Sequence, residues 1–225
     1  MKTNIQSIIN IHFLAFTMML GTCYNDSLAN AVNLARTLPY ESDKPKIVVV
    51  IDPGHGGNDL GSITSTGINE KEITLAVAEE IKRQGAGTGI EFILTRDLDQ
   101  NKTADERVAL SKKFSAVLFV SIHVNFDSDS LRSGIDLAFS GQNTFVSNSK
   151  ELAQQLLNEL QQLSGVKANS LKEADFYILT RNPVPAVTLD LGYMSNKSDL
   201  DFIQDPRNQA AVSKKIISAI VKYSK

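Results

Sequence analysis

The chain has 225 residues, of which 42% are hydrophobic and 21% charged, a balance typical of a globular protein with one buried core. Its formal net charge of −2 provides no basic surface for nucleic acid or for an anionic membrane. Trp is absent and aromatic residues make up 7%, which also argues against recognition of bases or sugars by stacking.

The first 31 residues have the layout of an export signal. Lys2 supplies a positive charge, residues 8–20 form an apolar stretch, and Ala29-Asn30-Ala31 matches an A-x-A cleavage pattern. The apolar stretch is short and interrupted by polar residues, so we predict no stable membrane insertion. A buried helix of the folded domain is the alternative interpretation. The polar, turn-rich stretch that follows favours a signal peptide over residues 1–31.

Cys23 is the only cysteine in the chain. Residues 20–23 loosely resemble a bacterial lipoprotein box, but Thr22 is unfavourable at the position before the cysteine. We therefore expect an exported protein, periplasmic or extracellular, with lipid anchoring through Cys23 as the alternative. Cleavage after Ala31 would leave a mature protein without disulfides. Residues 32–44 have the composition of a linker, and we place the folded domain at residues 45–225.

Strand-like and helix-like segments alternate from Ile47 onward. Continuous β-branched and apolar runs predict strands buried on both faces, and apolar residues at helical spacing predict helices. Thr103 and Glu106 form a capping box at the start of one helix, and Pro206 stands at the start of the last. The expected strands are 47–51, 90–95, 116–122, 135–139, 176–179 and 186–191, and the expected helices are 70–84, 103–114, 149–163 and 206–223. This alternation predicts an α/β fold, a three-layer sandwich with helices on both faces of a twisted, mostly parallel or mixed sheet of about six strands.

Two histidines stand at the ends of predicted strands. His55 lies in a glycine-rich turn after the first strand, and His123 closes the third strand. Ligands of such sheets bind at the carboxyl ends of the strands, so the two imidazoles could share one zinc ion. Two other interpretations stay open. Each histidine could be an ordinary hydrogen-bonded residue, or the turn could hold a phosphate, although the usual phosphate-binding glycine motifs are absent.

A catalytic zinc needs a third protein ligand and an open position for water. Glu70 and Glu72 are the acidic candidates near the start of the first predicted helix. Residues two apart point in different directions on a helix, so only one of them should face the histidines. Glu70 is favoured because it is adjacent to the loop that carries His55, but the spacing leaves Glu72 open.

Several spaced motifs resemble the zinc-dependent N-acetylmuramoyl-L-alanine amidases (the Amidase_3 family). The resemblance runs in consistent order from residue 46 to residue 225. It rests on VVVIDPGHGGNDLGS at 48–62, NEK at 69–71, LTRD at 94–97, ERVAL at 106–110, FVSIHVN at 119–125 and PAVTLDLGYMSN at 185–196.

This resemblance implies an α/β sandwich with one Zn²⁺ bound by His55, Glu70 and His123. It places Glu70, rather than Glu72, at the acidic position of the family pattern. It also implies a substrate, the amide between the lactyl group of N-acetylmuramic acid and L-alanine of the peptidoglycan stem peptide. The implied partners are therefore peptidoglycan and muropeptides, with no nucleic acid and with any regulatory protein unknown.

Asp190 is the one important departure from the family pattern. The family has Glu in the segment PAVxxELGFxSN, and the resemblance makes that residue the general acid and base. Asp is one methylene shorter, and a misplacement of about 1 Å can cost on the order of a hundredfold in rate. An alternative role for Asp190 is to orient a zinc-bound histidine or to cap a turn.

Three functions remain open. The first is an active peptidoglycan amidase, the second a zinc-retaining wall-binding protein that lost catalysis through Asp190, and the third a zinc hydrolase acting on another amide. Asn125, Tyr193 and Asn196 are unassigned neighbours of the site, whereas Arg96 and Arg107 are expected to be solvated or paired structural charges. The short stretch 125–148 leaves little room for an autoinhibitory helix, so we expect an open zinc site.

Overall fold

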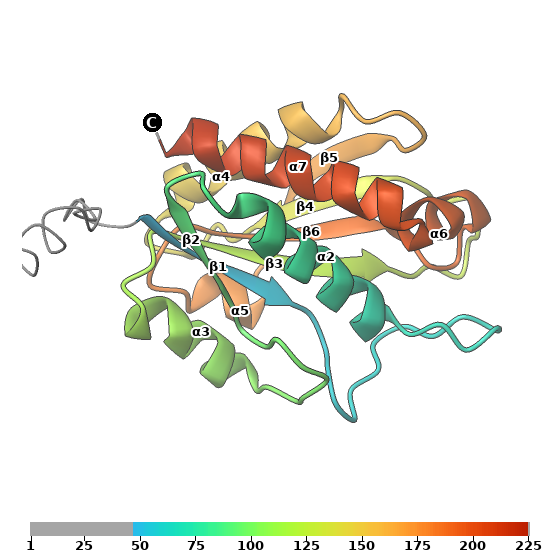
Figure 1. The fold of residues 1–225 in the computed structure, drawn as a ribbon, viewed down its shortest axis with the longest axis horizontal. Helices are drawn as coiled ribbons and strands as arrows, with labels where there is room; N and C mark the ends of the chain where they lie inside the picture. Colours follow the sequence, from blue (N-terminus) through green and yellow to red (C-terminus); the bar gives the residue numbers. More distant parts are fainter. Residues whose placement is uncertain (1–46, 225) are drawn as a thin grey trace, which may run out of the picture. The chain divides into compact units, whose positions relative to one another are not determined.

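The computed structural model describes residues 47–224 (Figure 1). The expected signal peptide at residues 1–31, the linker at 32–44 and Cys23 lie outside the described residues. The strands are β1 (Ile47–Pro53), β2 (Ile90–Leu94), β3 (Leu118–Asn125), β4 (Ile135–Phe139), β5 (Ala168–Glu173) and β6 (Ala186–Tyr193). The helices are α2 (Glu70–Gly85), α3 (Ala104–Lys113), α4 (Val146–Leu160), α5 (Tyr177–Thr180), α6 (Lys197–Gln204) and α7 (Pro206–Tyr223).

The strands form one mixed sheet in the order β2-β1-β3-β6-β4-β5. Neighbouring strands are parallel except for β4 and β6, which are antiparallel. Helices lie on both faces of the sheet, with α2, α4 and α7 on one side and α3 and α5 on the other (Figure 1). The predicted three-layer α/β sandwich is therefore confirmed.

The two faces carry cores of different size. On the face of α2, α4 and α7, leucine, isoleucine and valine side chains from the helices pack against the sheet in one large cluster. Each such side chain stabilises the fold by about 1.5–3 kcal/mol when fully buried. The opposite face has a small cluster around Val50, Phe119 and Leu179. The two helices on this face are short, α3 with 10 residues and α5 with 4.

On the face covered by α3 and α5, the side chains change from apolar to polar toward the carboxyl ends of the parallel strands. Alternate residues of a strand share a face, so the register decides which side chains meet. Three rows of side chains lie side by side across β1, β3 and β6: first Val50, Phe119 and Ala186, then Asp52, Ser121 and Thr188, and then His123 and Asp190. The polar end of this face is where the candidate site lies.

Three segments differ from the sequence prediction. Residues 176–179, expected as a strand, form the helical turn α5, which Asn143 holds by donating to the carbonyl oxygens of Leu179 at 2.6 Å and Asn182 at 3.0 Å. Neither β5 nor α6 was predicted. The capping box of Thr103 and Glu106 is confirmed, and helix α4 begins and ends three residues earlier than expected.

Among residues 47–224, no helix is both long and apolar enough to cross a bilayer.

Candidate metal centre

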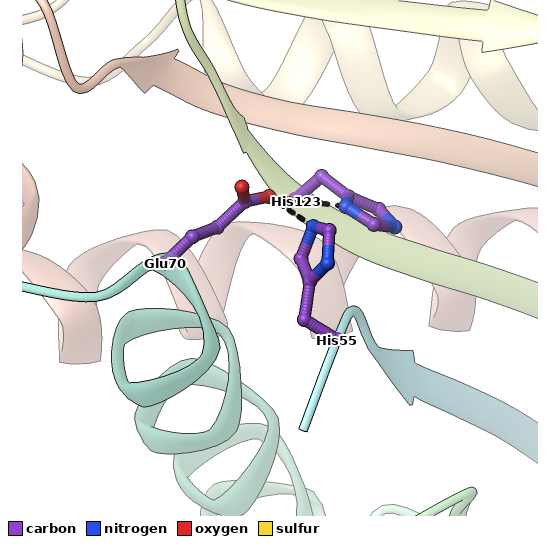
Figure 2. A group of neighbouring side chains, drawn as sticks. All are labelled: His55, Glu70 and His123. Atoms are coloured by element: carbon purple, nitrogen blue, oxygen red, sulfur yellow. Dashed lines mark hydrogen bonds and ion pairs between the residues drawn. The ribbon is translucent and has the colours of Figure 1, made fainter. Parts of the chain in front are cut away.

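The fold brings His55, Glu70 and His123 together (Figure 2). His55 lies in the turn after β1, Glu70 is the first residue of α2, and His123 belongs to β3. One ligand atom from each side chain lies within 4.8 Å of the others. Glu72, two residues further along α2, is exposed and accepts a hydrogen bond from Asn69 at 3.3 Å. The helix thus turns Glu70, and not Glu72, toward the histidines.

The carboxylate of Glu70 lies between the two imidazoles (Figure 2). Its Oε1 atom is 3.1 Å from Nε2 of His55 and 3.0 Å from Nδ1 of His123. The ring centroids of the histidines are 4.9 Å apart and the rings are nearly perpendicular, at 84°. The three groups therefore converge on one point from three different elements.

Hydrogen bonding keeps Glu70 ionised although it is buried. Burial alone would raise the pKa of this carboxyl, but bonds from His123 and His55 lower it. The backbone N–H groups of Ser62 and Val124 donate to it as well, each at 2.9 Å. The net result is a pKa well below the usual value for glutamate, so the Glu70 carboxylate is negatively charged at neutral pH.

Asp59 fixes the orientation of His55. Its Oδ2 atom lies 2.9 Å from Nδ1 of His55, which leaves Nε2 directed at Glu70. The hydrogen bond to Glu70, and after it the one to Asp59, raises the pKa of His55 above 6.5. A carboxylate behind a metal-binding histidine is a common arrangement because it fixes the tautomer and the ring orientation. Asp59 was not among the predicted site residues.

Two glycines let the three ligand candidates approach one another. A Cβ atom on Gly54 would lie 2.3 Å from Cε1 of His123, so the imidazole would have to move. Gly61 has a φ of 65°, and a Cβ there would lie 2.7 Å from both Oε2 of Glu70 and Cδ2 of His55. The glycine-rich turn is therefore explained by close packing around the three ligand candidates.

Buried arginines hold the turn that carries His55. Arg107 pairs with Asp52 at 2.7 Å and donates to the carbonyl oxygens of Pro53 at 2.8 Å and His55 at 2.7 Å. Arg96 donates to the carbonyl oxygens of Pro53 at 3.1 Å and Gly54 at 2.9 Å. Both side chains are buried: Arg107 is a paired structural charge, as expected, whereas Arg96 is neither solvated nor part of an ion pair among the described residues. Their part in shaping the turn was not predicted.

The backbone of the turn is unusual at His55 itself. His55 has a φ of 60°, in the left-handed region that side chains with a Cβ rarely adopt. The bond from Arg107 to the His55 carbonyl and the bond from Asp59 to the ring act on this one residue. They hold it in a conformation that the isolated turn would disfavour.

Asp190 borders the same cavity as the three ligand candidates. It lies on β6 opposite His123 of β3 in the parallel register. The cavity has a volume of about 550 Å³ and is lined by His55, Asp59, Gly61, Ser62, Glu70, His123, Val124, Asn125, Phe126 and Asp190. Burial raises the pKa of Asp190 above its usual value, although electrostatic attraction from His123 and Lys172 acts to lower that pKa.

The three unassigned neighbours have different positions. Asn125 lines the cavity. Tyr193 is buried and donates a hydrogen bond of 2.8 Å to Asp136, and burial together with this bond raises its pKa to about 12. Asn196 caps α6 by accepting from the backbone N–H groups of Ser198 and Asp199. Of the three, only Asn125 is among the residues that line this cavity.

The segment between β3 and β4 contains no helix. Residues 126–134 form turns in which Asp127 accepts from Arg132 at 2.8 Å, and Phe126 is 55% exposed. Within residues 47–224, this segment therefore provides no helical cover for the cavity.

Known proteins are similar to this chain in sequence and in fold. The family model described as N-acetylmuramoyl-L-alanine amidase matches residues 49–222. YqiI of Bacillus subtilis is 34% identical over 180 residues, which cover 78% of this chain and 84% of YqiI. The probable cell wall amidase LytH of Staphylococcus saprophyticus is 32% identical over 179 residues, which cover 78% of this chain but 57% of LytH, so the match spans little more than half of that relative.

Among solved structures, the amidase AmiC2 of Nostoc punctiforme superposes with a TM-score of 0.74 at 29% identity. The superposition covers 80% of this chain and 97% of that one. The family match extends over nearly all of the described residues, and it includes His55, Glu70, His123 and Asp190. The chain belongs to the N-acetylmuramoyl-L-alanine amidase family.

Proposed function

We propose that this protein hydrolyses the amide between N-acetylmuramic acid and L-alanine of peptidoglycan, with Zn²⁺ bound by His55, Glu70 and His123. The observation that carries the proposal is the convergence of these three side chains beside a cavity that Asp190 also lines. Family membership supports the same reaction and the same substrate class.

The chemistry of the three side chains fits zinc. Two imidazoles and one carboxylate form a common protein ligand set of catalytic zinc, and such a set leaves one coordination position for water or substrate. Glu70 is ionised, and Asp59 fixes the tautomer of His55. When bound there, Zn²⁺ supplies a Lewis acid that polarises the scissile carbonyl and lowers the pKa of water to about 7.

Asp190 is proposed as the group that moves the proton. Its carboxylate would take a proton from the attacking water and deliver it to the nitrogen of the departing L-alanine. Burial raises the pKa of this carboxyl toward the range in which it can both accept and return a proton. The register opposite His123 supports this role, because it places Asp190 at the edge of the same cavity.

The shorter acid leaves one alternative function. Asp190 reaches less far than the Glu that the family pattern has, so the protein could retain zinc and peptidoglycan while turning over slowly or not at all. In that case it would act as a zinc-retaining wall-binding protein.

Such a substrate would require export. Peptidoglycan lies outside the inner membrane, and we propose a periplasmic or extracellular location reached through a signal peptide at residues 1–31. The linker at 32–44 and the catalytic domain at 45–225 are part of the same proposal. Residues 126–134 form no helix over the cavity, so we expect activity without an added activator protein.

Digestion of purified muropeptides tests the proposal. The full chain should release stem peptide with a free L-alanine amine, a chelator should stop the release, and added Zn²⁺ should restore it. Asp190→Asn should lower turnover by roughly a hundredfold to ten-thousandfold because the proton carrier is lost.

Asp190→Glu separates the two functions. If the variant gains turnover while the wild type only binds muropeptides, the shorter acid is the cause and the wall-binding function is correct. Cleavage at another amide, or release that a chelator leaves unchanged, would contradict the proposal.

A further inference from the structure

An ion pair joins the helix that carries Glu70 to the loop between β2 and α3. The ammonium of Lys71, the residue after Glu70, lies 2.7 Å from Oδ2 of Asp99. The side chain of Lys71 is 11% exposed, whereas that of Asp99 is 57% exposed. Neither residue lines the cavity of the metal centre, so any part that the pair has in this centre is indirect.

Both charged groups of the pair bind Gly57, which stands two residues after His55. The backbone N–H of Gly57 donates to Oδ1 of Asp99 at 2.7 Å, and Nζ of Lys71 donates to the carbonyl oxygen of Gly57 at 2.9 Å. The backbone donor and the backbone acceptor of one glycine are thus both bound, and the two groups that bind them also bind each other. We refer to Gly57, Lys71 and Asp99 together as the Gly57 clamp.

The segment that the Gly57 clamp holds has an unusual backbone. His55, Gly56 and Gly57 have φ angles of 60°, 126° and 61°, so three consecutive residues lie at positive φ. At His55 this conformation is sterically disfavoured, and the two glycines can adopt many others. Hydrogen bonds to Gly57 therefore stabilise one conformation of the turn, and the direction of the His55 ring depends on that conformation.

The loop that carries Asp99 is packed directly against the same turn. A Cβ atom on Gly56 would lie 2.4 Å from the carbonyl oxygen of Gln100, and a Cβ atom on Gly57 would lie 2.7 Å from the backbone nitrogen of Asn101. The two backbones therefore touch without intervening side chains. Asp99 reaches Gly57 from a loop that is already in contact with the turn.

The turn has a second anchor on the other side of His55. Thr74 of α2 donates from its hydroxyl to the carbonyl oxygen of Gly54 at 3.0 Å, and Thr74 is fully buried. This anchor belongs to the packing of α2 on the sheet, whereas the Gly57 clamp lies nearer the surface. Both anchors lead from the His55 turn to the first two turns of α2, the helix that begins at Glu70.

We propose that Lys71 and Asp99 are positioning residues of the metal centre, which hold the imidazole of His55 in place relative to the Glu70 carboxylate. The proposal rests on the proposed function for the assignment of His55 and Glu70 as metal ligands, but not for the substrate. Exposed ion pairs contribute little to stability. Loss of the Gly57 clamp should therefore weaken metal binding much more than it weakens the fold.

Four variants of the full chain test the proposal. Asp99→Ala removes both bonds of the carboxylate, and Asp99→Asn keeps an oxygen that can accept from Gly57 but loses the charge. Lys71→Met removes the ammonium. Asp205→Asn is the matched control, because Asp205 also accepts from one backbone N–H, at 2.8 Å, and pairs with one cation, Arg207, at 2.6 Å, but does not line the cavity of the metal centre.

Asp99→Ala should raise the Kd for Zn²⁺ about tenfold, the lower end of the effect seen for residues that orient metal ligands. Asp99→Asn should raise it less, and Asp205→Asn should leave it unchanged. The double variant of Lys71→Met and Asp99→Ala should lose less affinity than the product of the two single losses, because both substitutions break one clamp. Competition with a chromogenic chelator measures these constants.

Two further measurements distinguish positioning from a general loss of structure. The urea midpoint of metal-free Asp99→Asn should shift no more than that of Asp205→Asn. With Co²⁺ in place of Zn²⁺, Asp99→Ala should change the visible absorption spectrum, which reports the coordination geometry, and Asp205→Asn should not. A zinc affinity of Asp99→Ala equal to that of the wild type, or a loss matched by Asp205→Asn, would overturn the proposal.

Hydrogen exchange in the metal-free protein separates this proposal from the proposed function. The N–H of Gly56 donates to the carbonyl oxygen of Asp59 at 2.8 Å, a bond in which Asp99 takes no part. In Asp99→Ala this amide should exchange about fivefold faster because the turn opens more often, while the amide of Val50 in β1 should be unaffected. If the wild type binds no Zn²⁺ but Gly56 exchanges faster in the variant, the proposed function fails and the clamp stands. If the exchange of Gly56 is unchanged, the clamp fails even where Zn²⁺ binds.

Discussion

At the scale of single residues, protons and a metal ion compete for the same nitrogen atoms. His55 and His123 both direct a ring nitrogen at the Glu70 carboxylate. In the metal-free protein the negative charge of Glu70 favours the protonated form of His55, so its pKa is raised above 6.5. A metal ion requires that nitrogen in its neutral form. The strength of the metal site should therefore depend on pH.

The sign of this dependence follows from the direction of the shift. A raised pKa of His55 means that its protonated form stabilises the metal-free fold below about pH 6.5, and that this contribution disappears as the pH rises through the raised pKa. We expect Zn²⁺ affinity to fall as the pH drops through that range, by about tenfold per unit for each proton displaced. Competition with a chromogenic chelator at several pH values from about 5.5 to 8.5 measures it.

A matched variant tests the cause of this pH dependence. Asp59→Asn removes one of the groups that raise the pKa of His55, so the midpoint of the affinity curve should move to lower pH. An affinity that stays constant over the range would contradict the assignment of His55 as a ligand, and a midpoint that Asp59→Asn leaves in place would contradict the role of Asp59.

The sequence predicted only part of this site. Placement at strand ends identified His55 and His123, because buried strands end where their apolar runs end. Spacing left Glu70 and Glu72 open, and only the family resemblance favoured Glu70. Asp59 was missed because its contact with His55 depends on the glycine turn, whose φ angles are not encoded in a short motif.

At the scale of elements, a buried ion pair fixes the turn between β1 and α2. Asp52, at the carboxyl end of β1, accepts from Arg107 of α3 at 2.7 Å and from Ser121 of β3 at 2.7 Å. Arg107 continues to the carbonyl oxygen of His55. Helix α3 and strands β1 and β3 thus determine the position of His55.

Arg107→Met should strongly destabilise the chain, because it leaves the buried Asp52 carboxylate without its positive partner. Breaking a buried pair in this way costs about 3–5 kcal/mol of unfolding free energy. Urea denaturation of the metal-free protein measures the change, and the variant should also bind Zn²⁺ more weakly because the His55 turn loses a support.

Arg83→Met is the control for this prediction. Arg83 pairs with Glu80 on the exposed side of α2, where solvent screens the interaction. Its loss should change the free energy of unfolding little and the zinc affinity not at all. Equal effects of the two substitutions would contradict a special role for the Asp52–Arg107 pair.

The helices and strands differ in how clearly their sequence patterns predict them. Helix α2 and strands β1, β2 and β3 follow clear apolar patterns and were expected. Strand β5, with the sequence ANSLKE, is an edge strand with partly exposed side chains, so it carries no apolar run. The run FYIL at 176–179 favours a strand by composition, but tertiary hydrogen bonds from Asn143 hold it as a helical turn.

At the scale of the whole molecule, the described residues contain a complete core. The large cluster on one face and the small cluster on the other are both built from residues 47–224. The proposed domain boundary at residue 45 rests on these observations.

A chain that begins at residue 45 should therefore fold and bind Zn²⁺ as the full chain does. We expect a Tm within about 2–4 °C of the full chain, the shift that corresponds to about 1 kcal/mol for a domain of this size. Calorimetry and zinc titration of both chains measure this. A chain that begins at residue 54 and lacks β1 should fail to fold, since β1 pairs with both β2 and β3. Loss of folding in the chain from residue 45 would contradict the boundary.

At His55, the left-handed backbone conformation favours glycine, whereas the metal centre needs an imidazole. A φ of 60° would cost glycine almost nothing, yet glycine would remove an imidazole from the metal centre. Any selection that rewards thermal stability alone would therefore favour glycine at this position and discard the activity. The turn is a place where this family member gives up stability for chemistry, and consensus-based stabilisation of the enzyme must leave residue 55 unchanged.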